Sequence, residues 1–177
     1  EWLWSRRECG EAPGLDPGSA DRAGPSAAFR DAAAGGHLAV LQWLWSTCSS
    51  HGITSLDPAA KDNAAFREAC RAGHLDVARW LWSLRDEAAV PIDATARENE
   101  AFREAAAHGH LSVLEFLWSL RTDHGVPINP LAHARAALRW AQANRHSAVV
   151  AWLEALDVSP ELEAEERAVE EAMVVRG

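Results

Sequence analysis

The sequence predicts an all-α protein built from a repeated pair of helices. A motif with the pattern Ala-Phe-Arg-acid-Ala begins at Ala28, Ala65 and Ala101. Each copy is followed by Gly-His-Leu, and the histidines His37, His74, His110 and His146 are 37, 36 and 36 residues apart. Within a copy, apolar residues recur at helical spacing on both sides of the glycine. A fixed interval of this length indicates stacked helical repeats.

The N-terminal residues carry a partial copy of the repeat. Trp2-Leu3-Trp4-Ser5 matches Trp43-Leu44-Trp45-Ser46 and Trp80-Leu81-Trp82-Ser83. We therefore assign residues 1–8 to a partial leading repeat and residues 9–26, which are rich in Gly and Pro, to a loop. Because the chain starts without Met inside a helical pattern, we expect it to be a fragment of a longer protein, and an upstream domain or signal peptide stays open.

The second complete copy shows the expected pair of helices most clearly. In the first helix, over residues 62–72, one face is apolar and consists of Ala65, Phe66, Ala69 and Cys70. Gly73 ends that helix because glycine adopts positive φ readily. The second helix, over about 75–84, is polar only along one narrow stripe, so it must be covered on several sides. Asp57-Pro58 and Asn129-Pro130 are typical helix starts, so some first helices begin before the Ala-Phe-Arg motif.

Four repeats are expected over 27–156, with approximate bounds 27–56, 57–93, 94–129 and 130–156. The fourth copy is degenerate, since Arg145 replaces the glycine and Ser147 the leucine. Residues 157–177 carry seven acids and two Arg, and Ser159-Pro160 is a helix-start signal. We expect an acidic helix there that caps the end of the repeats.

The segment from Ala65 to Leu81 resembles an ankyrin repeat, whose pattern in this register is Thr-Pro-Leu-His-x-Ala-Ala-x-x-Gly-His. The form with Ala-Phe-Arg resembles ankyrin arrays of large DNA viruses and some protists. The resemblance implies an ankyrin-like solenoid. However, arginine replaces the family's histidine, Asp62 and Glu98 replace the turn glycine, and each unit is about three residues longer than usual. We therefore expect β-hairpins that are reduced or absent.

Composition narrows the function classes. The net charge of −9 leaves no basic stripe, which disfavours binding of nucleic acid or an anionic membrane. The three cysteines, Cys9, Cys48 and Cys70, lack metal-ligand spacing and indicate free thiols in an intracellular, cytoplasmic protein. We expect no catalytic site and no cofactor, because no phosphate-binding loop, nucleophile motif or metalloprotease motif occurs. The repeated histidines lie too far apart to share a metal ion, and a structural role in the turn is favoured.

Tryptophans fall in two columns of the second helices. One position holds Trp43, Trp80, Phe116 and Trp152, and the other, two residues later, holds Trp45, Trp82 and Trp118. Two residues correspond to about 200° around a helix, so the columns face different ways. Both columns are expected to pack within and between repeats, and the alternative is that one forms an exposed strip that contacts a partner.

The arginines Arg30, Arg67, Arg103 and Arg139 also recur once per unit. We expect them to reach backbone carbonyls or carboxylates of the next repeat, and contact with a partner is the alternative. Partner-binding residues should instead differ between units. In the ankyrin family the variable positions lie just before the Gly-His pair, which points here to Arg71, His108 and Asn144, flanked by Glu68 and Glu104.

The sequence therefore predicts a monomeric scaffold that binds a protein partner along the groove of the first helices and loops. The alternative is a regulatory or substrate-recruiting segment of a larger protein. Such a protein could be an adaptor for degradation machinery or an enzyme whose catalytic domain lies upstream.

Overall fold

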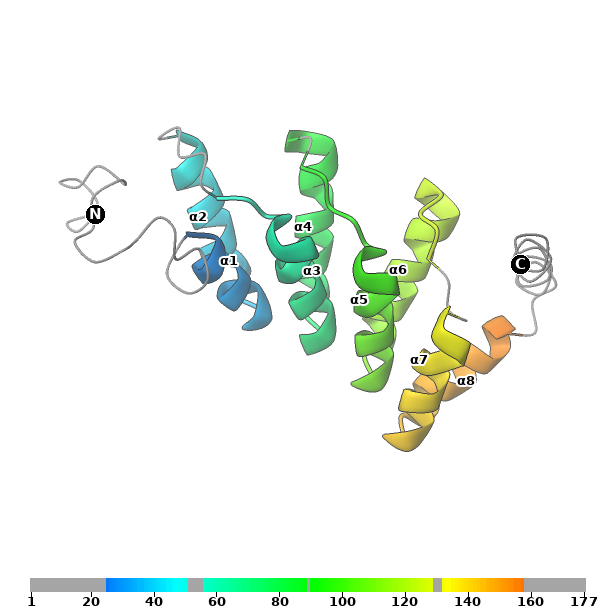
Figure 1. Ribbon diagram of the computed structural model, residues 1–177. Helices are drawn as coiled ribbons and strands as arrows, with labels where there is room; N and C mark the ends of the chain where they lie inside the picture. Colours follow the sequence, from blue (N-terminus) through cyan, green and yellow to red (C-terminus); the bar gives the residue numbers. More distant parts are fainter. Residues whose placement is uncertain (1–24, 51–55, 89, 129–131, 158–177) are drawn as a thin grey trace, which may run out of the picture. The chain divides into compact units, whose positions relative to one another are not determined.

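A computed structural model describes residues 25–50, 56–88, 90–128 and 132–157. Throughout these residues the regular secondary structure is entirely α-helical, as the sequence predicts (Figure 1). The helices are α1 (Pro25–Ala34), α2 (Leu38–Ser50), α3 (Ala60–Ala72), α4 (Leu75–Ala88), α5 (Ala96–Ala107), α6 (Leu111–His124), α7 (Ala132–Ala143) and α8 (Ser147–Asp157). The expected leading repeat, the Gly/Pro-rich loop up to residue 24, the Asn129-Pro130 start and the acidic helix beyond residue 157 lie outside the described residues.

The helices come in consecutive pairs joined by a tight turn. In the first pair, the N–H of His37 donates to the carbonyl of Ala32 at 2.9 Å, and the N–H of Gly36 donates to Ala33 at 3.2 Å. The same two bonds recur at residues 73–74, 109–110 and 145–146. They form a Schellman turn, which requires positive φ at the first residue of the turn. Gly36 has φ 72°, and Arg145, which replaces the glycine in the fourth copy, has φ 62°.

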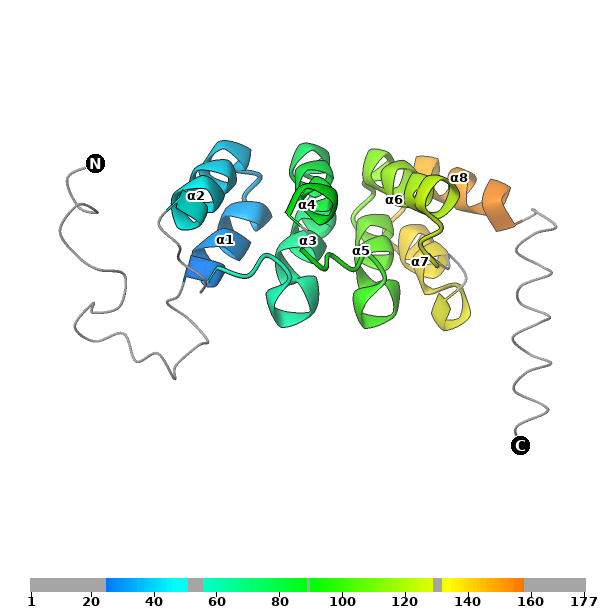
Figure 2. The ribbon, with the colours of Figure 1, turned by 90° about the horizontal axis from the view of Figure 1, so that it is seen from above.

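The chain forms two compact units, residues 1–93 and 94–177. The division falls between the expected second and third repeats. In the first unit α1 packs on α2 and α3, and α3 packs on α4. Figure 2 shows the first helices α1 and α3 in one layer and the second helices α2 and α4 in the other. Its buried aromatic core includes Phe29 and Phe66, which are at most 1% exposed.

The second unit repeats this plan with different residues. Helix α5 packs on α6 and α7, and α7 packs on α8. Phe102 occupies the position of Phe29 and Phe66 and is 1% exposed, while Leu114, Leu117 and Ile128 are fully buried. The apolar face that the repeat encodes is thus used in the same way in each unit.

The start of each central first helix is left-handed. Lys61, Asp62 and Asn63 have φ between 55° and 60°, and Arg97, Glu98 and Asn99 have φ between 53° and 61°. Right-handed helix follows from residues 64 and 100. A left-handed residue other than Gly costs about 1–2 kcal/mol, so two runs of three at the same position of the repeat need specific support. These turns stand where the ankyrin resemblance implied a glycine-containing β-turn.

The left-handed residues also change the helix start that Asp57-Pro58 predicts. The carboxylate of Asp57 accepts the N–H of Ala59 at 2.9 Å, so it does cap a turn. That turn precedes the left-handed residues, and helix α3 begins at Ala60, five residues before the Ala-Phe-Arg motif. Asp57-Pro58 thus begins a turn, but right-handed helix starts only after Asn63, and this change of hand was not predicted.

Candidate functional site

The repeated histidine links one helix pair to the preceding pair. Nε2 of His74 lies 3.1 Å from the carbonyl oxygen of Ala34 at the end of α1. In the second unit, Nε2 of His146 lies 3.0 Å from the carbonyl oxygen of Ala107 at the end of α5. Because a carbonyl can only accept, Nε2 carries the proton in both cases. These two histidines have the structural role in the turn that the sequence favoured.

The glycine of the same motif makes room for that imidazole. A Cβ on Gly36 would lie 2.6 Å from the ring of His74, and one on Gly109 would lie 2.5 Å from the ring of His146. At both positions a side chain would meet the next pair's histidine, in addition to the strain of a positive φ.

A second link connects the pairs at the other end of the first helices. In the first unit, the N–H of Asp57 donates to Oγ of Ser26 at 3.1 Å. One repeat later, the N–H of Asp93 donates to Oδ1 of Asn63, also at 3.1 Å. Ser26 and Asn63 occupy equivalent positions, so a polar side chain at the start of one first helix fixes the loop that enters the next. No pattern in the sequence predicts this role for Ser26 or Asn63.

The recurring arginine supports the left-handed turn of its own repeat. Nε of Arg67 donates to the carbonyl of Asp62 at 2.9 Å and its Nη2 donates to the carbonyl of Lys61 at 3.2 Å. In the second unit, Nη2 of Arg103 makes a longer bond, 3.5 Å, to the carbonyl of Arg97. These bonds of Arg67 and Arg103 go to the backbone of their own repeat, whereas we expected backbone carbonyls or carboxylates of the next repeat. Their carbonyl acceptors face them because the left-handed residues turn the backbone back toward the helix.

The first-helix arginine of repeat one is used differently. Arg30 pairs with the neighbouring Asp31 at 2.8 Å on the exposed face of α1. The residues that precede it as far as residue 24 lie outside the described part of the chain. The arginine column is thus one sequence feature with at least two local roles.

Most of the tryptophan columns are packed. In the first unit the ring of Trp80 lies 6.0 Å from Phe29 of the preceding pair, and Trp82 lies 6.4 Å from Phe66 of its own pair. Trp82 is only 6% exposed. Trp43 differs, since 49% of it is exposed. The two columns therefore pack between and within pairs in the second repeat, while Trp43 presents half of its surface to solvent.

Among the five residues predicted to bind a partner, Glu68 and Arg71 lie together on α3. Nη2 of Arg71 is 2.7 Å from the carboxylate of Glu68, one turn earlier on the helix. Their side chains are 46% and 33% exposed for Arg71 and Glu68 respectively. The pair is a partly exposed ion pair at the end of the first helix.

The other three lie together in the second unit. His108 Nδ1 is 3.0 Å from the carbonyl oxygen of Glu104 and 3.7 Å from the Glu104 carboxylate. The ring of His108 stacks parallel to that of His110, with centroids 6.2 Å apart. Asn144 donates from Nδ2 to the carbonyl of Ala107 at 2.8 Å, so it joins two helix pairs although its side chain lies at an exposed position.

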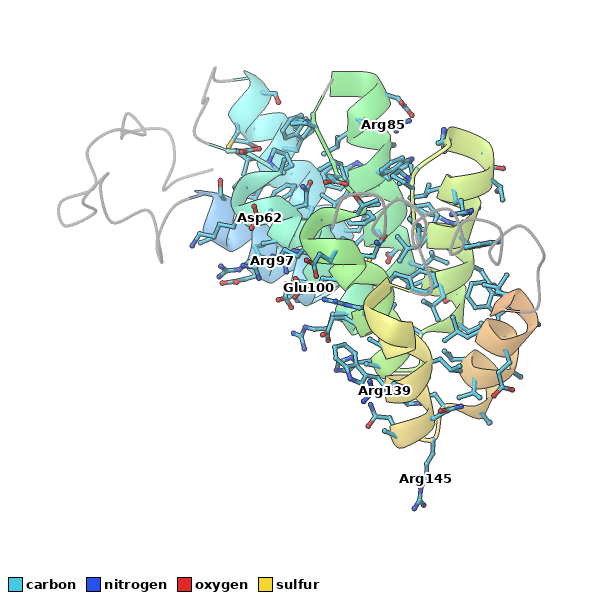
Figure 3. The ribbon with its side chains drawn as sticks, turned by 45° about the vertical axis from the view of Figure 1, so that its right-hand side comes forward. Asp62, Arg85, Arg97, Glu100, Arg139 and Arg145 are labelled. Atoms are coloured by element: carbon cyan, nitrogen blue, oxygen red, sulfur yellow. The ribbon has the colours of Figure 1, made fainter. Side chains whose placement is uncertain are left out.

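Trp140 is an accessible aromatic residue that lies outside both tryptophan columns. It follows Arg139 directly, where the other repeats have Asp31, Glu68 and Glu104, and it is 40% exposed. The guanidinium of Arg103 on α5 lies 5.8 Å from its ring, within the range of a cation–π contact. Figure 3 shows Arg139 on α7 and Arg145 extending away from the turn that follows it. The break in the repeat at this position was visible in the sequence, and our site prediction did not use it.

Metal ligands, membrane spans and thiols were also considered for the described residues. No group of three or more His, Cys, Asp or Glu side chains within them is arranged to hold a metal ion. None of their helices combines the length and apolar character that a membrane span requires. Cys70 is fully buried, and burial raises the pKa of its thiol far above the ordinary value. A thiol in this setting stays neutral and is a poor nucleophile.

Comparison of the chain with known protein families, curated proteins and solved structures finds no significant match.

Proposed function

We propose that the chain is an ankyrin-like helical-repeat solenoid that binds a protein partner along the surface of its first helices and their turns. The observation that carries the proposal is that recurring and varying positions of the repeat have different roles. Positions that recur, such as the phenylalanine, the glycine and the histidine, are used in packing one helix pair on another. Among the positions that differ between copies, Arg71, His108 and Asn144 carry exposed polar side chains.

The end of the first helix shows this division at a single turn. Gly36 and Gly109, which recur, receive the histidine of the next pair. Two residues before the recurring glycine, the second copy has Arg71 and the third has Ala107, and one residue before it they have Ala72 and His108. Side chains that vary from copy to copy on a constant framework are the usual means by which repeat proteins recognise a particular partner.

The exposed groups also suit a polar protein surface. Arg71 beside Glu68, and His108 beside Glu104, each offer a cationic or neutral donor next to a carboxylate. Trp140 adds an aromatic surface beside Arg103 in the second unit. Arginine and tryptophan are enriched among residues that dominate the energy of protein interfaces, so these residues are the expected contacts.

The test is quantitative affinity capture from extracts of the source cells with the wild-type chain and two charge-matched variants. Arg71→Glu reverses a charge on the proposed surface, and Arg79→Glu makes the same change at an exposed position of the second helix α4. A partner bound at the proposed surface should be recovered about tenfold less with Arg71→Glu, a loss of about 1.4 kcal/mol, and equally well with Arg79→Glu. Captured proteins that are lost equally with both variants, or with neither, contradict this binding surface.

A further inference from the structure

Helix α7 differs in charge from the other described first helices. In α1, α3 and α5 the recurring arginine is followed directly by an acid, whereas in α7 Arg139 is followed by Trp140. Helix α7 contains no Asp or Glu, and between Asp123 and Glu154 the sequence holds three arginines and no acid. This part of the second unit is therefore locally cationic, although the whole chain has a net charge of −9.

The position of Trp140 lies on the outer surface in each described copy of the repeat. The acids at this position have side chains that are 70%, 33% and 26% exposed, in the order Asp31, Glu68 and Glu104. Trp140 is 40% exposed. Because solvent-facing acids fill the same position in the earlier copies, the exposure of Trp140 belongs to the position and not to its place in the last described repeat. The indole thus replaces an acid on an outward-facing surface.

The arginine beside this indole has no acidic partner within the described part of the chain. In the first copy Arg30 pairs with Asp31 at 2.8 Å. Arg139 occupies the same position, is exposed, and forms no ion pair with any described carboxylate. Figure 3 shows it on α7. The replacement of the acid by Trp140 therefore leaves a positive charge next to an aromatic surface.

Arg103 of α5 brings a second guanidinium group to the same indole. Its guanidinium carbon lies 5.8 Å from the centre of the Trp140 ring. The bond from its Nη2 to the carbonyl of Arg97 is long, 3.5 Å, whereas the equivalent Arg67 is held by bonds of 2.9 and 3.2 Å. The carboxylate of the neighbouring Glu104 lies 3.7 Å from His108. Two arginines from two helices thus accompany one exposed indole.

We propose that the Trp140 surface, which consists of Arg103, Arg139 and Trp140, binds an acidic peptide segment of the partner that also carries an apolar side chain. The inference rests on the proposed function and names the chemistry of the partner in the second unit. A guanidinium group can donate two parallel hydrogen bonds to one carboxylate, and the indole offers a flat surface to an apolar side chain. Asn144 holds α7 to the carbonyl of Ala107 on α5 at 2.8 Å, so the surface is formed before the partner binds.

Single-stranded nucleic acid is the alternative ligand, since arginine and tryptophan also bind phosphates and bases. A nucleic acid carries a phosphate at every nucleotide and is bound along an extended cationic groove. Here Glu104 directly follows Arg103 and its side chain is 26% exposed, so the cationic area is short. The net charge of −9 also repels a long polyanion. A short acidic segment with an apolar residue suits this area better.

The experiment selects ligands for the whole chain from a displayed library of random linear peptides. Selected peptides are synthesised with a fluorescent label, and their affinities are measured by anisotropy beside a labelled oligonucleotide of about ten thymidines. Enriched sequences should combine Asp or Glu with Phe, Leu or Trp. Replacing the acids of the tightest peptide by their amides, or its apolar residue by Ser, should each lower the affinity about tenfold.

Variants of the chain locate the binding. Arg139→Glu should weaken the tightest peptide about tenfold and Trp140→Ala at least as much, since arginine and tryptophan dominate the energy of protein interfaces. Arg79→Glu makes the same charge change on the second helix α4 and should alter the affinity by less than about twofold, because distant charges are screened by salt. Circular dichroism verifies that each variant is folded.

Three results overturn the inference. The first is enrichment of peptides without acids, or no enrichment at all. The second is a set of acidic peptides that bind Arg139→Glu and Trp140→Ala as tightly as the wild type; if they are lost with Arg71→Glu, the proposed function stands and the Trp140 surface alone is wrong. The third is an oligonucleotide that binds more tightly than every peptide and is lost with both α7 variants, which would identify the alternative ligand.

Discussion

The imidazole of His146 occupies the space in which the side chain of residue 109 would begin. Gly109 has φ 81°, and a Cβ there would lie 2.5 Å from Nδ1 of His146. The same histidine holds the carbonyl of Ala107 through its other nitrogen. One glycine thus allows both the turn that ends α5 and the approach of the helix pair α7–α8.

Gly109→Ala should therefore destabilise the chain more than a change that affects backbone conformation alone. Gly125 is the matched control, because its φ is 64° and a Cβ there would meet nothing within 4 Å. Gly125→Ala should cost about 1 kcal/mol of unfolding free energy, the penalty of a left-handed alanine. Gly109→Ala should cost a further 1–3 kcal/mol or so, since the ring must move. Urea unfolding measures both, and equal losses would show that the ring yields freely.

Arg67→Met should reveal how strongly the left-handed turn depends on its arginine. The change keeps most of the side-chain volume and removes the donors that hold the carbonyls of Lys61 and Asp62. Hydrogen bonds from charged donors contribute about 1.5–3 kcal/mol, so we expect a loss of about 2–3 kcal/mol in unfolding free energy.

Arg30→Met is the control for this experiment. Arg30 occupies the same position of the repeat and pairs with exposed Asp31, so its loss should cost less than about 1 kcal/mol. If both variants unfold at the same denaturant concentration, the carbonyl contacts of Arg67 do not stabilise the turn.

Trp82→Ala tests the packing interpretation of the second tryptophan column. Trp82 is 6% exposed and lies against Phe66, so truncation should cost about 3–5 kcal/mol. Trp140→Ala, at 40% exposure, should cost less, about 1–2 kcal/mol. Differential scanning calorimetry of both variants measures these losses of stability. Unchanged melting of Trp82→Ala together with loss of partner binding would instead favour the exposed-strip alternative.

Cys70 should make stability depend on alkaline pH. Its pKa is raised by burial, so the folded chain keeps a proton that the unfolded chain releases above the ordinary thiol pKa. The unfolded state then binds fewer protons, and unfolding free energy falls as pH rises above about 9, by up to about 1.4 kcal/mol per pH unit for one thiol. Below that pH this contribution is constant.

Comparison with Cys70→Ala isolates the thiol from other groups that titrate in the same range. The slope of unfolding free energy between about pH 9 and 10 should be smaller in the variant than in the wild type. Parallel slopes would mean that the thiol is accessible enough to ionise in the folded chain.

The sequence predicted the helices because their signals are local and repeated. Gly73 was assigned as the end of a first helix and Leu75 as the start of the next, and the structure has those bounds. The fourth copy was recognised although Arg145 replaces the glycine, and the backbone there adopts the same positive φ. Because the same pattern occurs in several copies, helix bounds that are ambiguous in one copy can be assigned from the others.

The left-handed turns were not predicted because no single residue signals them. Lys61-Asp62-Asn63 and Arg97-Glu98-Asn99 contain no glycine, and only Asp62 and the two asparagines are residue types that adopt positive φ with some ease. Their support comes from the guanidinium of Arg67, four residues beyond Asn63, and from loop contacts such as Asp93 with Asn63. Such contacts depend on tertiary geometry that hydrophobic periodicity does not contain.

The candidate site was predicted only in part for a similar reason. Arg71 and His108 are exposed, in keeping with positions that vary between copies. Asn144 was chosen by the same rule, and its bond to Ala107 shows that it also holds two helix pairs together. Variation between copies identifies positions where the repeat tolerates different residues. The structure is needed to show which of these residues, such as Asn144, also contact a neighbouring helix pair.

The two left-handed turns also affect how the chain absorbs polarised light. Residues 61–63 and 97–99 have backbone angles that mirror those of the helices they begin. Peptide groups in mirror-image conformations contribute ellipticity of opposite sign, so each run offsets part of the signal at 222 nm from its own helix. Circular dichroism will accordingly report fewer helical residues than the chain contains, and the deficit should shrink when either turn is unwound.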